Sequence, residues 1–446
     1  MEKTELKAFG HNVSERLAGI IQFKTISYTD LSKIDFSQFD GMHEYLEQAY
    51  PLIHNRLIKE TDEARNLSFF WEGTNKELPP IALLAHQDVV PVNEEKWSTP
   101  PFSGEIRDGY VYGRGSIDMK GQLISVMESV ETLLQEGFVP ERSIYLLFGA
   151  DEEPLGDNGA VVLSGRLKEK GVRLHFVLDE GCLIRYGNDL GIERVIAPVS
   201  ICEKGVMNLR LTAKGTSGHA SMPPRETAVE ALAKAINSLE RHPMKSRLNY
   251  PVIYMIKALS PHMKGCFKFL FSNSRLFGGI IKSILGKSPD TAALLHTTFA
   301  PTQLSASNAP NVLADSASVV FNIRIAPGED KETVFAHIDR HAKDLEKEIL
   351  FYNPPSPVSS IDEEAYRQVS AAIEKVFPEM IVSPYMLTAA TDSRHFYQVC
   401  DNVYRFSPFP SLKDDRSRMH GDDERLNIES LERGVEFYRQ LIRTVC

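Results

Sequence analysis

The sequence predicts an α/β protein with a mainly parallel central sheet, helices on both of its faces, and a smaller α+β domain inserted into it. Three observations support this prediction. Apolar strand-like runs alternate with helical patterns over about the first 180 residues. Strands of alternating polarity follow after residue 203, which is typical of a sheet with one wet face. The length of 446 residues also exceeds the size at which a single hydrophobic core stops growing.

The first predicted elements follow from the spacing of apolar residues. Residues 6–21 have the pattern of an amphipathic helix, and residues 80–85 form a continuous apolar run typical of a strand buried on both faces. That strand is predicted to end at His86. A hairpin-like stretch at 104–113 and an amphipathic helix at 120–137 come next.

Two more buried strands, at 143–149 and 175–178, enclose a helix predicted at 159–170 and complete this layer. Ligands of such sheets gather outside the carboxyl ends of the strands. The polar groups that follow the predicted strand ends are His86, Glu152-Glu153 and Asp179-Glu180. We therefore expect the chemistry of the protein to lie at this edge.

The inserted domain is predicted at 203–355, between the two parts of the main domain at 1–202 and 356–446. Its expected elements are strands at 206–212 and 316–325, helices at 229–239 and 330–345, and then a returning helix of the main domain at 363–376. An extra segment at about 243–295 contains two apolar clusters. We expect it to be a packed helical insert. The alternative is an exposed apolar patch that binds lipid or substrate.

Composition excludes several classes of protein. Acidic residues outnumber basic ones by 60 to 50 and no Lys/Arg block stands out, which argues against nucleic-acid binding. The five cysteines are widely spread and include no Cys-x-x-Cys pair, which fits a reducing compartment. The N-terminal residues have no apolar core behind them. We therefore expect no signal peptide, no membrane span and a cytoplasmic location.

An acidic triplet, Asp151-Glu152-Glu153, directly follows one buried strand. In a hydrolytic metal site one such carboxylate can bind a cation while its neighbour takes a proton from water. A solvated acidic turn is the alternative reading of the triplet taken alone. Further nitrogen and oxygen ligands follow other elements, and Asp88 stands two residues after a histidine whose ring it could orient. These candidates are His86, Asp118, Asp179, Glu180 and His420.

Together these segments resemble the M20 family of zinc peptidases and aminoacylases over nearly the whole chain. The matching motifs are Leu84–Val92, Gly113–Gly121, Asp151–Glu153 and Met419–Arg425. Glycines at 113–121 match neither a dinucleotide fingerprint nor a Walker loop, so a phosphate loop is a weak rival. The form Asp179-Glu180-Gly181 and the long insert are most similar to the carboxypeptidase S and aminoacylase-1 branch.

The resemblance implies two Zn²⁺ ions, for which Co²⁺ or Mn²⁺ could substitute. One ion would be held by His86 and Glu180, with Asp179 as the alternative to Glu180. The other would be held by Glu153 and His420, and Asp118 would bridge the two. Glu152 would then be the general acid/base.

The resemblance also assigns roles in the inserted domain. His219 would stabilise the oxyanion of the tetrahedral intermediate, often from the partner subunit, so a homodimer is expected. Asn311 and Arg324 would bind substrate, and the planar guanidinium suits a free carboxylate. The expected substrate is a small peptide, as for a carboxypeptidase or dipeptidase. An N-acyl amino acid, as for an aminoacylase, is the alternative, and a non-catalytic metal-binding protein the remote one.

Overall fold

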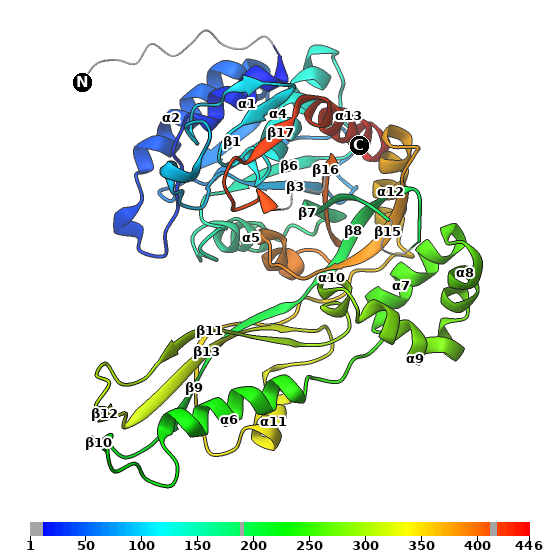
Figure 1. The fold of residues 1–446 in the computed structure, drawn as a ribbon. Coiled ribbons are helices and arrows are strands. Elements are labelled where there is room, and N and C mark those ends of the chain that lie inside the picture. Colours follow the sequence, from blue (N-terminus) through cyan, green and yellow to red (C-terminus); the bar gives the residue numbers. More distant parts are fainter. Residues whose placement is uncertain (1–11, 188–190, 411–416) are drawn as a thin grey trace. The chain divides into compact units, whose positions relative to one another are not determined.

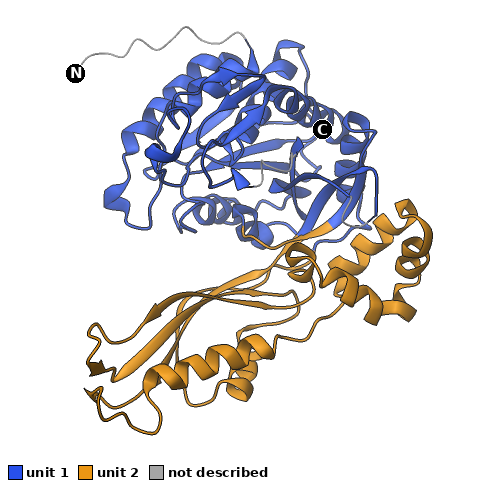
Figure 2. Ribbon diagram, in the orientation of Figure 1, with its two compact units in different colours: residues 1–201, 359–384, 391–446 blue, residues 202–358, 385–390 orange. Residues whose placement is uncertain are grey.

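The computed structural model describes residues 12–187, 191–410 and 417–446. The chain divides into two compact units (Figure 2). Unit 1 contains the described residues of 1–201, 359–384 and 391–446, and unit 2 contains 202–358 and 385–390. The short segment 385–390 thus joins unit 2, although the sequence analysis placed it in the main domain.

Unit 1 is built on one eight-stranded sheet (Figure 1). Its four central strands are mutually parallel, and the flanking pairs β1–β2, β2–β6 and β16–β8 are antiparallel. The predicted α/β class is confirmed. In sheet order the strands are β1 (Ile58–Thr61), β2 (Leu67–Trp71), β6 (Ile144–Gly149), β3 (Ile81–His86), β7 (Phe176–Tyr186), β16 (Val403–Pro410), β8 (Val195–Glu203) and β15 (Ile381–Leu387).

Strand β7 is longer than predicted. The apolar run ends at Leu178, but the strand continues to Tyr186 because its backbone pairs with β16, where Asp179 lies opposite Arg405, and at its end with β8. Asp179 and Glu180 therefore lie inside a strand and not beyond its end. His86 likewise is the last residue of β3.

Helices cover both faces of this sheet. Strand β3 is fully buried, and its successive side chains point to opposite faces. Ala82 and Leu84 pack with Leu163 of α5 and with Phe396. Helices α4, α1 and α13 pack on one another, and α4 and α13 also contact β3 and β16. The helices of unit 1 are α1 (Val13–Ile21), α2 (Phe36–Ala49), α3 (Pro51–Arg56), α4 (Lys120–Gln135), α5 (Ala160–Glu169), α12 (Glu364–Val376) and α13 (Ile428–Val445).

The start of α1 differs from the predicted helix at 6–21. Asn12 caps α1 by accepting a hydrogen bond from the backbone N–H of Glu15. Residues 6–11 of the prediction lie outside the described part of the chain.

A small antiparallel sheet joins distant parts of unit 1. It consists of β4 (Ile106–Arg107), β5 (Tyr110–Tyr112) and β17 (Arg425–Asn427), in the order β17-β5-β4. Arg425 pairs with Tyr112. This pairing brings the segment that contains His420 beside the loop that follows β5, which contains Asp118.

Unit 2 contains a four-stranded antiparallel sheet in the order β11-β13-β9-β14. Alternate residues of β9, among them Leu209 and Leu211, form a core with Leu232 of α6 and Val334 of α11. The elements are β9 (Gly205–Lys214), β11 (Thr298–Ser305), β13 (Ser316–Ile325), β14 (Glu346–Asn353), α6 (Ala228–Arg241) and α11 (Lys331–His341). Helix α11 is shorter than predicted, because the chain turns at Ala342 and enters β14.

A short ladder and a helical insert complete unit 2 (Figure 1). The ladder pairs β10 (Gly218–His219) with β12 (Val312–Leu313). The helices of the insert are α7 (Tyr250–Leu259), α8 (Gly265–Ser272), α9 (Ser274–Leu285) and α10 (Pro289–Ala292). Among the described residues, no helix has both the length and the apolar character needed to cross a membrane.

Candidate active site

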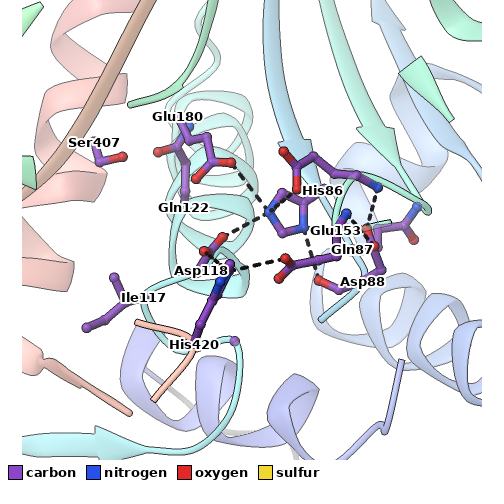
Figure 3. A network of polar contacts seen from close by, with 12 residues as sticks. His86, Gln87, Asp88, Ile117, Asp118, Gln122, Glu153, Glu180, Ser407 and His420 are labelled. Carbon is purple, nitrogen blue, oxygen red and sulfur yellow. Dashed lines mark hydrogen bonds and ion pairs between the residues drawn. The ribbon is translucent and has the colours of Figure 1, made fainter. Parts of the chain in front are cut away.

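Four predicted ligands from unit 1 converge on a fifth, the carboxylate of Asp118 (Figure 3). One oxygen, Oδ1, lies 3.0 Å from Nε2 of His86, and the other, Oδ2, lies 3.0 Å from Nε2 of His420. Glu180 lies 3.5 Å from the same nitrogen of His86, and Glu153 lies 3.2 Å from that of His420. The structure therefore contains two three-residue groups that share Asp118.

The two groups fit divalent metal ions. Ligands at about 2.0–2.1 Å from a tetrahedral zinc are roughly 3.3 Å from one another, close to the separations measured here. The donors are imidazole nitrogens and carboxylate oxygens, which suit zinc, cobalt or manganese. Within the described part of the chain, the buried Oε1 of Glu153 also has no hydrogen-bond partner. A cation would satisfy that oxygen.

Electrostatics point to the same need for positive charge. Burial, together with the nearby charge of Asp118, raises the pKa of Glu180 to about 8. Burial also raises the pKa of Glu153. Burial disfavours charge on Asp118, but hydrogen bonds from His420 and His86 hold its pKa well below the usual range. Three buried carboxylates thus compete for two histidines, and metal ions would relieve that competition.

His86 presents Nε2 to the cluster because its other ring nitrogen is engaged. Nδ1 donates a hydrogen bond to the backbone carbonyl of Asp88 at 3.0 Å, while the carboxylate of Asp88 is 3.5 Å away. Nε2 therefore faces Asp118 and Glu180, and it is the nitrogen that would bind a metal ion there. The carbonyl contact is shorter than the side-chain contact that the sequence suggested.

The carboxylate of Asp88 organises the acidic triplet. It is fully buried and accepts hydrogen bonds from the backbone N–H groups of Glu152 and Glu153, at 3.2 and 3.1 Å. The hydroxyl of Ser27 donates a third hydrogen bond at 2.5 Å. Asp88 therefore fixes the turn that directs Glu153 toward His420.

Glu152 lies next to the metal-ligand groups but belongs to neither of them. Its carboxylate is 4.0 Å from Nε2 of His86 and is buried. Burial raises the pKa of Glu152 well above its usual range, and the charges of Glu180 and Glu153 add to the shift. A raised pKa is what a carboxyl group needs in order to hold a proton more readily than an ordinary surface glutamate does.

Asp179 and Glu180 point in different directions, as successive residues of a strand do. Asp179 accepts hydrogen bonds from its neighbour's N–H and from the backbone N–H of Ser393, both at 2.8 Å. Glu180 lies in the group with His86 and Asp118. Asp151 is also turned away from the cluster, and it accepts a hydrogen bond from the N–H of Asn158 that closes the loop after the triplet.

Sequence reasoning missed Glu424, which positions the loop containing Asp118. Its carboxylate is fully buried and accepts hydrogen bonds from the backbone N–H groups of Gly115, Ile117 and Asp118, at 3.0, 2.8 and 3.1 Å. Arg114 donates another at 2.5 Å. Glu424 was visible in the last motif as one acid in an acidic run, but nothing in the sequence distinguished it from its neighbours.

We expect Glu424→Gln to destabilise the protein and to weaken metal binding. The NH₂ group of the glutamine would face the backbone N–H donors of the Asp118 loop, and Arg114 would lose its buried charged partner. We expect the free energy of unfolding to fall by about 3–5 kcal/mol. Glu136→Gln is the matched control, because Glu136 pairs with Arg439 and Arg443 at the surface, where such pairs contribute about 0–1 kcal/mol. Chemical unfolding and metal titration measure both effects. Equal stability of the two variants would contradict this role for Glu424.

A second missed residue is Asp392, at the start of the 3-10 helix η5 (Asp392–Gln398). A methyl group on Gly149, at the end of β6, would lie 2.7 Å from its carboxylate, so the strand end needs glycine there. Burial, with the charges of Asp179 and Asp88, raises the pKa of Asp392 well above its usual range. The polar run at 391–395 after an apolar strand was the available signal.

The other predicted site residues belong to unit 2. His219 is exposed in β10, and its Nδ1 accepts a hydrogen bond from the N–H of Ser221 at 3.2 Å. Asn311 precedes β12, and its carbonyl accepts a hydrogen bond from Ala220, so the ladder holds it near His219. Arg324 lies in β13, eight residues beyond Ser316, which is about 26 Å at the rise of a strand. Its Nε donates to Asn322 at 3.1 Å.

The fold of unit 1 and its two groups of nitrogen and oxygen ligands define a metal-dependent hydrolase. The chain belongs to peptidase family M20/M25/M40, whose sequence profile matches residues 82–444.

Similar proteins agree with this membership. A protein of Dictyostelium discoideum named "Probable carboxypeptidase S-like 2" is 36% identical over 97% of this chain and 84% of its own length. An N-fatty-acyl-amino acid synthase/hydrolase of Xenopus tropicalis is 37% identical over 96% of this chain and 85% of its own.

Solved structures show the same fold. An M20 family metallo-carboxypeptidase from Sulfolobus solfataricus superposes with a TM-score of 0.72 at 16% identity, covering 98% of this chain and 99% of the other. Human carnosine dipeptidase 1 superposes with a TM-score of 0.65 at 15% identity, covering 97% and 96%.

Proposed function

We propose that this protein is a two-zinc amidohydrolase that cleaves the amide bond next to a C-terminal amino acid with a free carboxylate. The observation that carries the proposal is the shared carboxylate of Asp118, whose two oxygens each face a different histidine at 3.0 Å. Each histidine also has its own glutamate, Glu180 or Glu153. This supports Glu180, and not Asp179, as the ligand beside His86.

Zinc, when bound, would act as a Lewis acid toward the scissile carbonyl and would make a nearby water molecule more acidic. The protein supplies the proton transfers. Glu152 takes a proton from the attacking water and delivers it to the leaving nitrogen, because it lies beside the ligands without being one of them. Asp88 keeps Glu152 in place through its backbone N–H.

The resemblance of Gly215–Ser221 to the family's lid motif supports a role for His219 in stabilising the oxyanion. Arg324 lies about 26 Å from Ser316 at the rise of a strand, and Ser316 pairs with Lys214, which precedes His219 by five residues, so His219 follows the end of the sheet far from Arg324. A small substrate cannot contact both from one subunit. We therefore propose that the enzyme is a homodimer in which His219 serves the site of the partner subunit.

Mixing two inactive variants tests this arrangement. A dimer of Glu152→Gln and His219→Ala chains contains one site with both intact residues, so random subunit exchange should restore about a quarter of wild-type activity if His219 contributes at the 10²-fold level or more expected of an oxyanion donor. Activity is measured after mixing and compared with each variant alone. No recovery after demonstrated exchange would show that His219 does not act across a dimer.

The acyl side of the substrate has two candidates. A peptidyl group is the first, as in the carboxypeptidases and dipeptidases among the similar structures. A fatty acyl group is the second, as in the similar N-fatty-acyl-amino acid synthase/hydrolase of Xenopus tropicalis. Metal-reconstituted enzyme given dipeptides, N-acetyl and long-chain N-acyl amino acids, with products read by mass spectrometry, would decide between them.

We expect Arg324→Lys to raise KM about 10–100-fold with a smaller change in kcat, because lysine cannot form the bidentate pair with a carboxylate. Substrates whose carboxylate is blocked as an amide should be poor for the wild type and little affected by the substitution. Initial rates with each matched pair of substrates give the comparison. An equal effect on free and blocked substrates would show that Arg324 does not bind the substrate carboxylate.

A further inference from the structure

The helical insert of unit 2, residues 243–297, differs in charge from the rest of the chain. Between residues 243 and 290 it has eight lysines and arginines and a single acidic residue, Asp290, whereas the whole chain has a net charge of −10. The basic residues are spread over 48 positions, so no block stands out in the sequence. In the described structure, Lys257, Lys268 and Arg275 form no ion pair with a carboxylate.

The insert also exposes large apolar side chains. Tyr250 is 72% exposed, Phe269 61%, Leu276 81% and Ile280 50%. Each of the three main helices contributes at least one of them. A monomeric soluble protein seldom shows several such side chains together without a binding function.

Two of these four side chains line the same groove. A groove of about 610 Å³ runs between α7 and α9, and its lining includes Tyr250, Leu276 and the two lysines Lys257 and Lys282. The ring of Phe269 on α8 lies 5.5 Å from that of Phe277 on α9. Figure 1 shows α7, α8 and α9 gathered together in unit 2. We call this surface, formed by Tyr250, Lys257, Phe269, Arg275, Leu276, Ile280 and Lys282, the basic-apolar patch.

Helix α9 shows how the patch is built. Leu276 and Ile280 are one helical turn apart and point outward, while Ile281 and Leu285 are buried in the insert. The outward face cannot be part of the core of the insert. It combines apolar side chains with cations, which is the pattern of a helix that lies in the interface of a membrane.

We propose that the basic-apolar patch docks the protein on the surface of a bilayer that contains anionic lipids. The aromatic and aliphatic side chains would enter the boundary between headgroups and acyl chains, and the lysines and arginines would face the lipid phosphates and carboxylates. Charge complementarity favours this occupant over a second copy of the chain, because two facing patches would bring the three cations of one, Lys257, Arg275 and Lys282, against the same three of the other. The proposal goes beyond the catalytic function and does not depend on it.

Vesicle flotation of the full-length protein tests the proposal. The probes are vesicles of phosphatidylcholine alone and vesicles with about a third phosphatidylserine, whose surface potential attracts basic residues. We expect binding to the mixed vesicles that weakens as salt is raised, and much weaker binding to phosphatidylcholine alone. The double variants F269S/L276S and K257E/R275E should each lower the affinity for mixed vesicles by about tenfold or more.

Matched controls separate this patch from general surface effects. Val139→Ser removes an apolar side chain of unit 1 that is 66% exposed, and Lys76→Glu reverses a charge there whose side chain is 77% exposed. Both should bind vesicles like the wild type. Thermal unfolding checks that all variants fold. The same assay on Glu152→Gln protein shows whether docking is independent of hydrolysis.

Three results would overturn the proposal. The first is no binding to mixed vesicles at low salt. The second is equal loss of binding in the patch variants and the controls. The third is a change of oligomeric state in F269S/L276S, measured by sedimentation, with vesicle binding unchanged, which would make the patch an interface between copies of this chain.

Discussion

Replacing Glu152 with glutamine is expected to lower kcat by about 10³-fold or more while both metal ions stay bound, because general acid/base catalysis by one side chain contributes about 10²–10⁴-fold. Glutamine keeps the shape of the side chain but cannot accept and return a proton. The carboxylate lies outside both ligand groups, 4.0 Å from Nε2 of His86, so its loss leaves the ligands in place. Steady-state rates and metal analysis of the purified variant measure the two effects.

The metal-free form of this variant offers a second test. Burial raises the pKa of Glu152 in the folded protein, so folding favours the protonated form of this group. Its contribution to the stability of the fold is fully present below its ordinary pKa of about 4.5 and is lost as the pH rises. Metal-free Glu152→Gln should therefore unfold at the same temperature as the metal-free wild type at pH 7–8, or higher. A variant that kept near wild-type turnover would remove Glu152 from the mechanism.

Replacing Asp118 with asparagine is expected to remove at least one metal ion and to lower kcat by about 10³-fold, because loss of Lewis-acid stabilisation costs several kcal/mol. Asp118 is the residue common to both ligand groups. An asparagine amide has a single oxygen, so it cannot place one oxygen beside each histidine as the carboxylate of Asp118 does. Metal content by elemental analysis, together with the activity regained at high zinc, gives the measurement.

Asp392→Asn is the matched control for this experiment. Asp392 is a buried carboxyl group of the same unit, and it belongs to neither ligand group. Burial raises the pKa of Asp392 well above its usual range and so disfavours its charged form, which a neutral asparagine of similar shape replaces. We expect Asp392→Asn to keep both metals. Full metal content in Asp118→Asn would contradict the bridging role of Asp118.

Much of the fold follows from local patterns. The buried run at Ile81–His86, the helix at Lys120–Gln135 and the alternating strand at Ser316–Ile325 lie close to where their apolar spacing predicted them. Such elements bury one clear face, so the pattern and the structure must agree. The full length of β7 could not be predicted in this way, because it depends on pairing with β8 and with β16, which lies more than 200 residues away in the chain.

The candidate site likewise combines features that the sequence predicts with features that depend on the tertiary structure. Position at the ends of buried strands made His86 and Glu153 candidate ligands, since ligands gather at that edge of such sheets. The roles of Asp118 and His420 came from the resemblance of their motifs to the M20 family. The sequence alone did not decide whether Asp179 or Glu180 is the metal ligand. Only the alternation of side chains along a paired strand shows that Glu180 points to His86 while Asp179 turns toward Ser393.

The sequence by itself determined the α/β class, the inserted α+β domain as a prediction, and the kinds of side chain available for catalysis, because these depend on local periodicity and on residue chemistry. The tertiary structure decided which groups meet. It placed the buried Glu424 under the loop of Asp118 and gathered scattered cations and apolar side chains into one patch. Hydrogen bonds and shared surfaces join residues far apart in the chain, and spacing along the sequence does not record them.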